Sequence, residues 1–248
     1  MCLCHNTKDA CCQALDYDEV IKLIAPIQRF ADVVTKSDQT RFSMIAIAGL
    51  VLAGGEGRRM GGNKPFRQIG GRPLIAMAVE NAGRHCDPVM ISSNQPPETF
   101  AAYKANVVAD IPKAGQGPLG GVLGGLTALP DGVDWLVTFP VDCPVVPDDM
   151  AAMLVSAALD AGVRAAFARH GDRDHYLSSA WHRESAPVIA KLLADDDRRV
   201  RAPLRALDAV AVTFPRQQSD LAMFANANTI DDLAELEKMM AARPSKAM

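Results

Sequence analysis

Short apolar runs alternate along the chain with stretches in which apolar residues recur every three or four positions. A run of the first kind is typical of a buried strand, and the second spacing is typical of a helix with one apolar face. The pattern predicts strands at 45–52, 89–93, 107–109, 135–139, 163–168, 177–181 and 209–213. It predicts helices at 74–82, 118–129, 147–159, 185–194, 198–207 and 229–240.

This alternation is typical of α/β proteins, in which a mostly parallel sheet carries helices on both faces. We expect residues 44–248 to form one Rossmann-like domain, with its ligand beyond the carboxyl ends of the strands. Residues 1–43 differ, because an amphipathic helix at 16–34 and a polar linker at 35–40 are predicted there. Since Met44 directly precedes the first strand, residues 1–43 are expected to be an accessory extension or to precede the true translation start.

Composition narrows the possible partners. The 248 residues carry a formal net charge of −3, without the basic surface that binding of nucleic acid requires. No apolar run is long enough to span a bilayer, and the first residues are too polar for a signal peptide, so no membrane contact and a cytoplasmic location are expected. Among six cysteines, Cys86 and Cys143 are expected to be small buried side chains. The alternatives for the other four cysteines are reduced thiols or a metal or redox site, although their spacing fits such a site poorly. These cysteines are Cys2, Cys4, Cys11 and Cys12.

A glycine-rich, cationic loop follows the first predicted strand. The glycines within 54–57 let the backbone approach a ligand closely, and Arg58, Arg59 and Lys64 add positive charge. Backbone N–H groups and cations together favour a triphosphate site, and the alternative is a tight turn with solvated arginines. The loop has neither the Gly-Lys-Ser/Thr of the P-loop nor the glycine rhythm of dinucleotide-binding proteins. The loop is long, because the first helix begins only at Leu74. A loop of this length can wrap around the phosphates of a nucleotide.

Two aspartates stand at predicted strand ends, where ligands bind in α/β sheets. Asp142 follows the strand at 135–139, and its carboxylate suits Mg²⁺, which takes one or two protein carboxylates together with water and phosphate oxygens. A helix cap or a turn is the alternative for this residue. Asp110 follows the strand at 107–109 and is expected to be a second metal ligand, an acceptor for the nucleotide or a turn residue.

A second glycine-rich stretch at 115–121 leads into a predicted helix. Its glycines either present the helix N-terminus to an anion or form a flexible loop. His175 enters a later predicted strand and favours a role in ligand binding, because no Ser or Cys nucleophile is suggested beside it.

Two pairs of polar residues in the last third of the chain allow two interpretations each. Arg198 and Arg199 follow a run of aspartates and either form a solvated helix boundary or face an anionic acceptor. Asn226 and Asn228 alternate along a predicted extended segment and either bind a ligand or cap the last helix.

In order and spacing, these segments resemble the bacterial molybdenum cofactor guanylyltransferases and, behind them, the nucleotidyltransferase fold of nucleotide-sugar pyrophosphorylases. The similarity runs from about Ile47 to about Leu236 and leaves residues 1–43 outside. Its opening signature, Leu-Ala-Gly-Gly-x-x-x-Arg-Met-Gly-Gly, is shared by many nucleotidyltransferases, whereas the later motifs point to the molybdopterin branch. The motifs that carry the similarity are 52–62 with Lys64, 71–74, 117–119, 140–144, 173–175, 198–200 and 226–229.

The resemblance implies roles for individual residues. Lys64 would hold the phosphates, Asp142 would bind Mg²⁺, and Arg59 would complete the catalytic set. Contact with the guanine nucleotide is implied for Leu52, Ala53, Gly54, Gly55, Lys64, Asp110 and Asp142, and at the place of a family asparagine for Ser92 or Asn94. The chain departs from the family's Gly-Gly-x-Asp-Lys, because its loop at 61–64 is one residue shorter and lacks the aspartate.

The resemblance also implies the reaction. GMP would pass from GTP to the terminal phosphate of molybdopterin, with Mg²⁺ as cofactor and pyrophosphate as the second product. A cytidylyltransferase for the same cofactor, or another nucleotidyltransferase acting on a phosphate, is the nearest alternative. The alternative from another functional class is a non-catalytic nucleotide- or cofactor-binding delivery protein. Molybdoenzymes or their chaperones are further expected partners.

Overall fold

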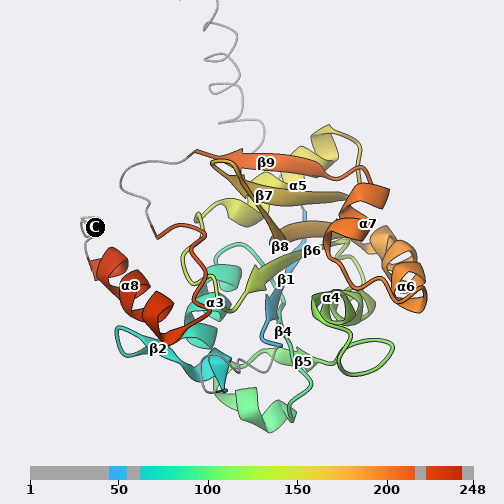
Figure 1. Cartoon of the computed structure of the whole chain (residues 1–248). Coiled ribbons are helices and arrows are strands. Elements are labelled where there is room, and N and C mark those ends of the chain that lie inside the picture. The colour runs from blue at the N-terminus through green and yellow to red at the C-terminus, as the bar shows by residue number, and fades with distance from the viewer. Residues whose placement is uncertain (1–44, 55–61, 216–221, 242–248) are drawn as a thin grey trace, which may run out of the picture. The chain divides into compact units, whose positions relative to one another are not determined.

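The computed structural model describes residues 45–54, 62–215 and 222–241 (Figure 1). The predicted extension at 1–43, with its helix and four cysteines, lies outside these ranges. None of the helices in the described ranges combines the length and the apolar character that a membrane span requires.

A seven-stranded sheet lies at the centre of the described domain. Its order is β5-β4-β1-β6-β8-β7-β9, and β8 alone runs antiparallel to its neighbours. The predicted mostly parallel sheet is therefore confirmed, and the carboxyl ends of the other six strands lie at one edge. The strands are β1 (Ile47–Leu52), β4 (Val89–Ser92), β5 (Asn106–Val108), β6 (Trp135–Pro140), β7 (Ala165–His170), β8 (Arg173–His182) and β9 (Val210–Phe214).

Helices cover both faces of the sheet, as the alternating pattern predicts (Figure 1). Apolar residues of α4, α6 and α7 share one buried cluster with the β1 side chains Ala48, Leu50 and Leu52. The helix α3 packs on the opposite face at Gly49, where an added Cβ would lie 3.0 Å from Ala82. The helices are α3 (Leu74–Gly83), α4 (Pro118–Thr127), α5 (Met150–Asp160), α6 (Ala186–Ala194), α7 (Arg201–Ala206) and α8 (Ile230–Ala241).

The glycines of α4 bring this helix unusually close to the strand ends. A Cβ on Gly121 would lie 2.1 Å from Ser92 Oγ, and one on Gly124 would lie 2.2 Å from the carbonyl oxygen of Ala109. Both distances are far below van der Waals contact. The glycine-rich sequence therefore serves close packing, which sets the N-terminus of α4 beside the ends of β4 and β5.

The elements predicted between residues 45 and 240 are all present, with ends displaced by a few residues, and Thr229 caps the start of α8. Asp232 N–H donates to Thr229 Oγ1 at 3.0 Å, while Thr229 N–H donates to Asp232 Oδ2 at 2.9 Å. The strand predicted at 177–181 is longer, because β8 begins at Arg173. The short hairpin of β2 (Gln68–Ile69) and β3 (Arg72–Pro73) and the 3-10 helix η3 (Pro97–Tyr103) have no counterpart among the predictions.

Candidate active site

A pocket of about 560 Å³ lies at the carboxyl ends of β1, β4, β5 and β6. Every described residue for which nucleotide or metal contact is predicted lines this pocket: Leu52, Ala53, Gly54, Lys64, Ser92, Asn94, Asp110 and Asp142. Ala53 N–H donates to the carbonyl oxygen of Ser92 at 3.0 Å, which joins the ends of β1 and β4. Gly55, Arg58 and Arg59 lie outside the described residues. The structure thus brings the described set together, and the role of each residue stays a prediction.

Lys64 lines this pocket and follows a tight turn. Asn63 takes a left-handed conformation with φ 52°, and the 3-10 helix η2 (Lys64–Phe66) follows directly. Asparagine tolerates this conformation better than most residues, which suits the shortened loop. Lys64 Nζ lies 2.7 Å from Asp142 Oδ2 and 3.1 Å from Asn228 Oδ1. Three segments far apart in the sequence therefore meet at one ammonium group.

Asp142 is held at the end of β6 by its backbone. Val141 N–H donates to the carbonyl oxygen of Leu52 at 3.2 Å, and Ala227 N–H donates to the carbonyl oxygen of Asp142 at 2.8 Å. These bonds leave the carboxylate free to face the pocket, where only 18% of the side chain is exposed. Burial, with a smaller contribution from Asp142, raises the pKa of the Cys143 thiol far above its usual range. The Cys143 thiol is therefore protonated, and the side chain is buried, as the sequence predicts.

Asp110 organises the second glycine-rich loop. Its Oδ2 accepts hydrogen bonds from Gly115 N–H at 3.1 Å, Gln116 N–H at 3.2 Å and Asn94 Nδ2 at 3.0 Å. Asn94 Oδ1 accepts in turn from Asp110 N–H at 3.1 Å. Of the three predicted roles, these bonds show the turn residue, while contact of Asp110 with a metal or a nucleotide stays a prediction.

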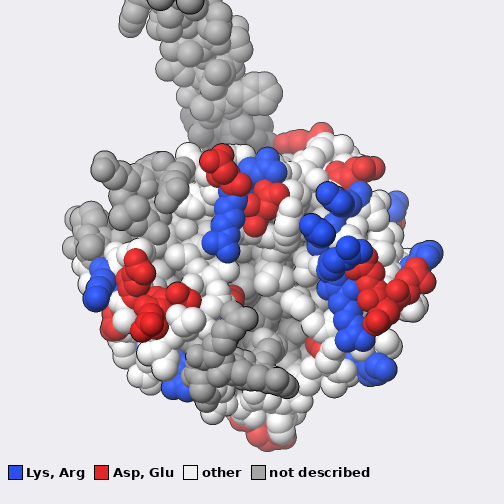
Figure 2. Space-filling view, in the orientation of Figure 1, with Lys and Arg blue, Asp and Glu red and all other residues white. Residues whose placement is uncertain are grey.

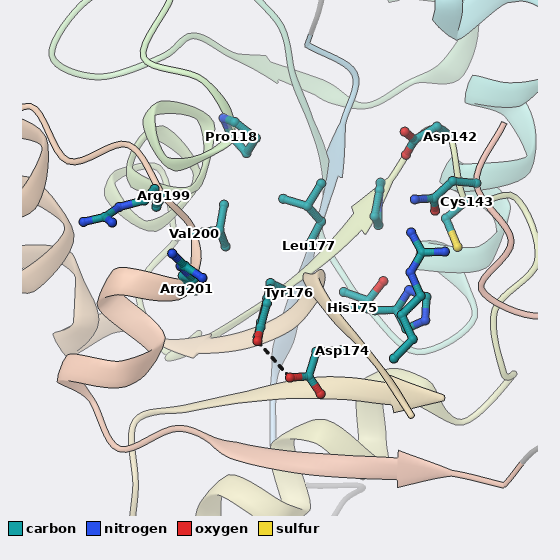
Figure 3. Close-up of a pocket in the computed structure, with 14 residues that line it drawn as sticks. Pro118, Asp142, Cys143, Asp174, His175, Tyr176, Leu177, Arg199, Val200 and Arg201 are labelled. Carbon is teal, nitrogen blue, oxygen red and sulfur yellow. Dashed lines mark hydrogen bonds between the residues drawn. The ribbon is translucent and has the colours of Figure 1, made fainter. Parts of the chain in front are cut away.

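A second pocket, of about 550 Å³, adjoins the first (Figure 3). Among the described residues, both pockets are lined by Pro118, Pro140, Asp142 and Leu177. In Figure 3, Asp142, Cys143 and His175 lie at one end, Arg199 and Arg201 lie at the other, and Leu177 stands between them. Arg173 and Asn226 also line the cavity. The pocket at the strand ends and a pocket lined by arginines thus meet at Asp142.

The cationic end is oriented by acidic neighbours. Arg199 forms a two-bond pair with Asp197, with distances of 2.8 and 2.6 Å, and this pair lowers the pKa of Asp197 to about 2. Figure 2 shows such acidic and basic side chains side by side over the region of α6 and α7. Arg198 does not line the second pocket, since its Nη1 donates to the carbonyl oxygen of Gly115 at 3.1 Å.

His175 is uncharged at neutral pH. Burial, followed by the charges of Arg173 and His170, lowers the pKa of this imidazole to about 4. Its ring lies 4.8 Å from that of Phe224. A neutral, half-buried ring suits the binding role that the sequence favours.

Sequence reasoning missed several residues of the second pocket. Arg201 has only its proximity to Arg199 as a signal, and Tyr176, Leu177 and Ser178 lie in a region that reads as ordinary strand. Tyr176 donates its hydroxyl to Asp174 Oδ2 at 2.8 Å (Figure 3). Of the asparagine pair, Asn226 lines the second pocket and Asn228 contacts Lys64, so neither side chain forms the cap of α8.

Comparison with known proteins agrees with this geometry. Residues 49–237 match the family model described as the MobA-like NTP transferase domain. The chain is 37% identical over 200 residues to a molybdenum cofactor guanylyltransferase of Rhodopseudomonas palustris (strain BisB5), covering 78% of this chain and 94% of the relative. It is 40% identical over 194 residues to the molybdenum cofactor guanylyltransferase of Cereibacter sphaeroides, covering 77% of this chain and 96% of the relative.

A solved structure shows the same fold. It is described as molybdopterin-guanine dinucleotide biosynthesis protein A from Archaeoglobus fulgidus, and it matches with a TM-score of 0.65 and 23% identity over 78% of this chain and 98% of that chain. The family model covers more than half of the sequence, and the relatives match at nearly their full length. The chain therefore belongs to the MobA-like NTP transferase family and is a nucleotidyltransferase.

Proposed function

We propose that this protein transfers GMP from GTP to the terminal phosphate of molybdopterin, forming molybdopterin guanine dinucleotide and releasing pyrophosphate. The observation that carries the proposal is the meeting of two pockets at Asp142, one lined by the predicted nucleotide residues and the other by three arginines. The names of the relatives, molybdenum cofactor guanylyltransferases, support the same pair of substrates.

In the proposed reaction, a phosphate oxygen of molybdopterin attacks the α-phosphorus of GTP. The bond from that phosphorus to the oxygen bridging to the β-phosphate breaks, and its electron pair leaves with pyrophosphate. The protein has to hold two anions that repel each other and to stabilise the charge of the transferring phosphoryl group. Lys64 would contact the triphosphate, while Arg173, Arg199 and Arg201 would hold the second substrate.

Mg²⁺ fits the donor set of this site. Among the described residues, no group of three or more His, Cys, Asp or Glu side chains could hold a metal ion by itself. One strand-end carboxylate, Asp142, suits a hard cation that keeps water and phosphate oxygens as its other ligands. When bound, the ion would neutralise phosphate charge and orient the triphosphate. Lys64 would have to leave Asp142 at that moment, and Asn228 offers it a second acceptor.

The loop at 55–61 is also proposed to bind the triphosphate. Gly55 and Arg59 belong to the signature that follows β1, and Arg59 is proposed as a cation for the triphosphate. We further propose that the protein acts in the cytoplasm, which agrees with the free thiols of Cys86 and Cys143.

Residues 1–43 are proposed as a separate extension, because the family match begins at residue 49 and the nucleotidyltransferase motifs lie downstream. A chain that begins at Met44 should remain folded and active. An insoluble or inactive shortened chain would contradict this proposal.

The test of function is pyrophosphate release with Mg²⁺ and molybdopterin, comparing GTP, CTP and ATP. Release with GTP alone supports guanylyl transfer. Release with CTP would retain the mechanism and make the protein a cytidylyltransferase. Binding of a nucleotide without release of pyrophosphate would identify a delivery protein for the cofactor.

A further inference from the structure

The second pocket opens where β8 separates from β6. Backbone pairing between these strands covers Trp135 to Val137 against Ala180 to His182. At Thr138, side-chain hydrogen bonds replace the backbone pairing. Thr138 Oγ1 donates to the carbonyl oxygen of Leu177 at 2.7 Å and accepts from Ser179 N–H at 3.1 Å. The first half of β8 therefore lies away from β6, which leaves space for a ligand.

The same segment bulges from its other neighbour, β7. Phe167 pairs with Ser179, but the next residue, Ala168, pairs with His175. Three residues of β8, Tyr176 to Ser178, thus have no counterpart on β7, and we call them the β8 bulge. Bulges redirect side chains and are frequent beside active sites. All three residues of the β8 bulge line the second pocket.

Ser178 differs from its neighbour Ser179 in the hydrogen bonding of its hydroxyl. Both Ser178 and Ser179 are buried, with exposed fractions of 1% and 0%. Ser179 Oγ donates to the carbonyl oxygen of Tyr176 at 3.1 Å and lies 3.1 Å from Thr138 Oγ1. Ser178 Oγ has no hydrogen-bond partner among the described residues. A buried polar atom without a partner is unfavourable for folding alone, so it calls for a ligand or a water.

We propose that Ser178 is a specificity-determining residue, whose hydroxyl forms a hydrogen bond with the second substrate in this pocket. The inference rests on the proposed function, since molybdopterin is the substrate assigned to the cavity. The free protein has already desolvated the hydroxyl, so the bond adds to affinity without a further desolvation cost on the protein side.

The group that Ser178 binds is neutral. Anionic groups of the ligand have guanidinium partners in the same cavity, from Arg173, Arg199 and Arg201. A single hydroxyl can both donate and accept, which suits an amide or amino edge of a heterocycle. Ser178 therefore recognises the pterin part of the substrate rather than its phosphate.

The experiment compares wild type with Ser178→Ala and Ser178→Cys. Cysteine keeps the connectivity of the side chain, with a larger terminal atom, and is a weak hydrogen-bonding group, so it separates the filling of the site from hydrogen bonding. Binding of molybdopterin is followed by its pterin fluorescence, and KM and kcat are measured for both substrates. Both variants should bind molybdopterin about tenfold more weakly, with the KM for GTP and kcat unchanged.

Thermal stability supplies the control for a purely structural role. Ser178→Ala should melt at or above the wild-type temperature, because it removes an unpartnered polar atom, whereas Ser179→Ala should melt lower, because it loses bonds to Thr138 and Tyr176. If wild type binds molybdopterin and the Ser178 variants bind it equally well, the hydroxyl meets only a buried water and the inference is wrong, while the proposed function stands. If wild type neither binds nor converts molybdopterin, both proposals fail.

Discussion

The ammonium group of Lys64 lies 2.7 Å from the carboxylate of Asp142, 78 positions further along the chain, and both side chains are largely shielded from solvent. In the proposed mechanism these two groups serve different partners, the triphosphate and Mg²⁺. Their ion pair in the free protein therefore keeps the charge of each compensated until the nucleotide and its metal arrive. The exchange of partners should be visible in binding experiments.

Lys64→Met should alter metal and nucleotide affinity in opposite directions. Without the ammonium group, Asp142 is available to a cation, so Mn²⁺ should bind the nucleotide-free protein several-fold more tightly, because the nearby positive charge is gone. GTP should bind at least about tenfold more weakly, because a charge-assisted bond to phosphate is lost. Electron paramagnetic resonance of Mn²⁺ and titration calorimetry measure the two effects. Lys64→Arg keeps the charge and is the control, and unchanged affinities in Lys64→Met would remove the lysine from this scheme.

Asp142→Ala should abolish turnover while leaving the fold intact. The backbone of Asp142 is held by bonds to Ala227 and from Val141 to Leu52, which the substitution does not touch. Loss of the carboxylate that lines both pockets should lower kcat by about 10³-fold or more, since metal-assisted charge stabilisation is worth several kcal/mol. Circular dichroism and pyrophosphate release test the two parts separately. Near-normal rates in this variant would exclude Asp142 from the mechanism.

The two asparagines before α8 should separate the two substrates. Asn228 contacts Lys64 at 3.1 Å, whereas Asn226 lines the second pocket. Asn228→Ala should therefore raise the KM for GTP, and Asn226→Ala should raise the KM for molybdopterin, each by roughly three- to tenfold. The capping bonds of Thr229 and Asp232 remain in both variants, so melting temperatures should stay close to that of wild type. Equal effects of both variants on both constants would contradict the assignment.

Much of the fold could be predicted because its signals are local. The buried strands β1 and β6 read as apolar runs, and Pro118 marks the start of α4. The antiparallel direction of β8 and its bulge depend on pairing with β7 and β6, which no local pattern records.

The site was predictable to a similar extent. Strand-end positions singled out Asp142 and Asp110, but the bonds from Asp110 to Gly115 and Gln116 required the loop's actual path. The contact of Lys64 with Asn228 joins residues 164 positions apart, and only the folded chain reveals it.

Gly121→Ala should disturb the nucleotide pocket through Ser92. The new Cβ would lie 2.1 Å from Ser92 Oγ and 3.1 Å from Ser92 Cβ, so α4 or the end of β4 has to move. Overpacking of this kind typically costs about 1–3 kcal/mol of unfolding free energy. Denaturant unfolding and the KM for GTP should both report it.

A matched control exists on another helix. Gly83 ends α3 with nothing within 4 Å of an added Cβ. Gly83→Ala should therefore leave stability unchanged or raise it by up to about 1 kcal/mol. Combining Gly121→Ala with Ser92→Ala should recover part of the lost stability, and no recovery would locate the clash elsewhere.

His175 should make the folded state sensitive to mild acid. Burial holds the pKa of its imidazole at about 4 in the folded protein, against 6.5 ordinarily. Between these values the unfolded chain binds the proton and the folded chain does not, so stability is complete above about pH 6.5 and falls as the pH drops toward 4. Because the ring is only half-buried, we expect a loss of about 1 kcal/mol between pH 7 and pH 5, after allowance for screening by solvent. Urea unfolding across this range should show a smaller loss for His175→Gln than for wild type, since glutamine has no proton to bind. Identical pH profiles for the two proteins would mean that the imidazole titrates normally and is not shielded by Phe224 and the pocket wall.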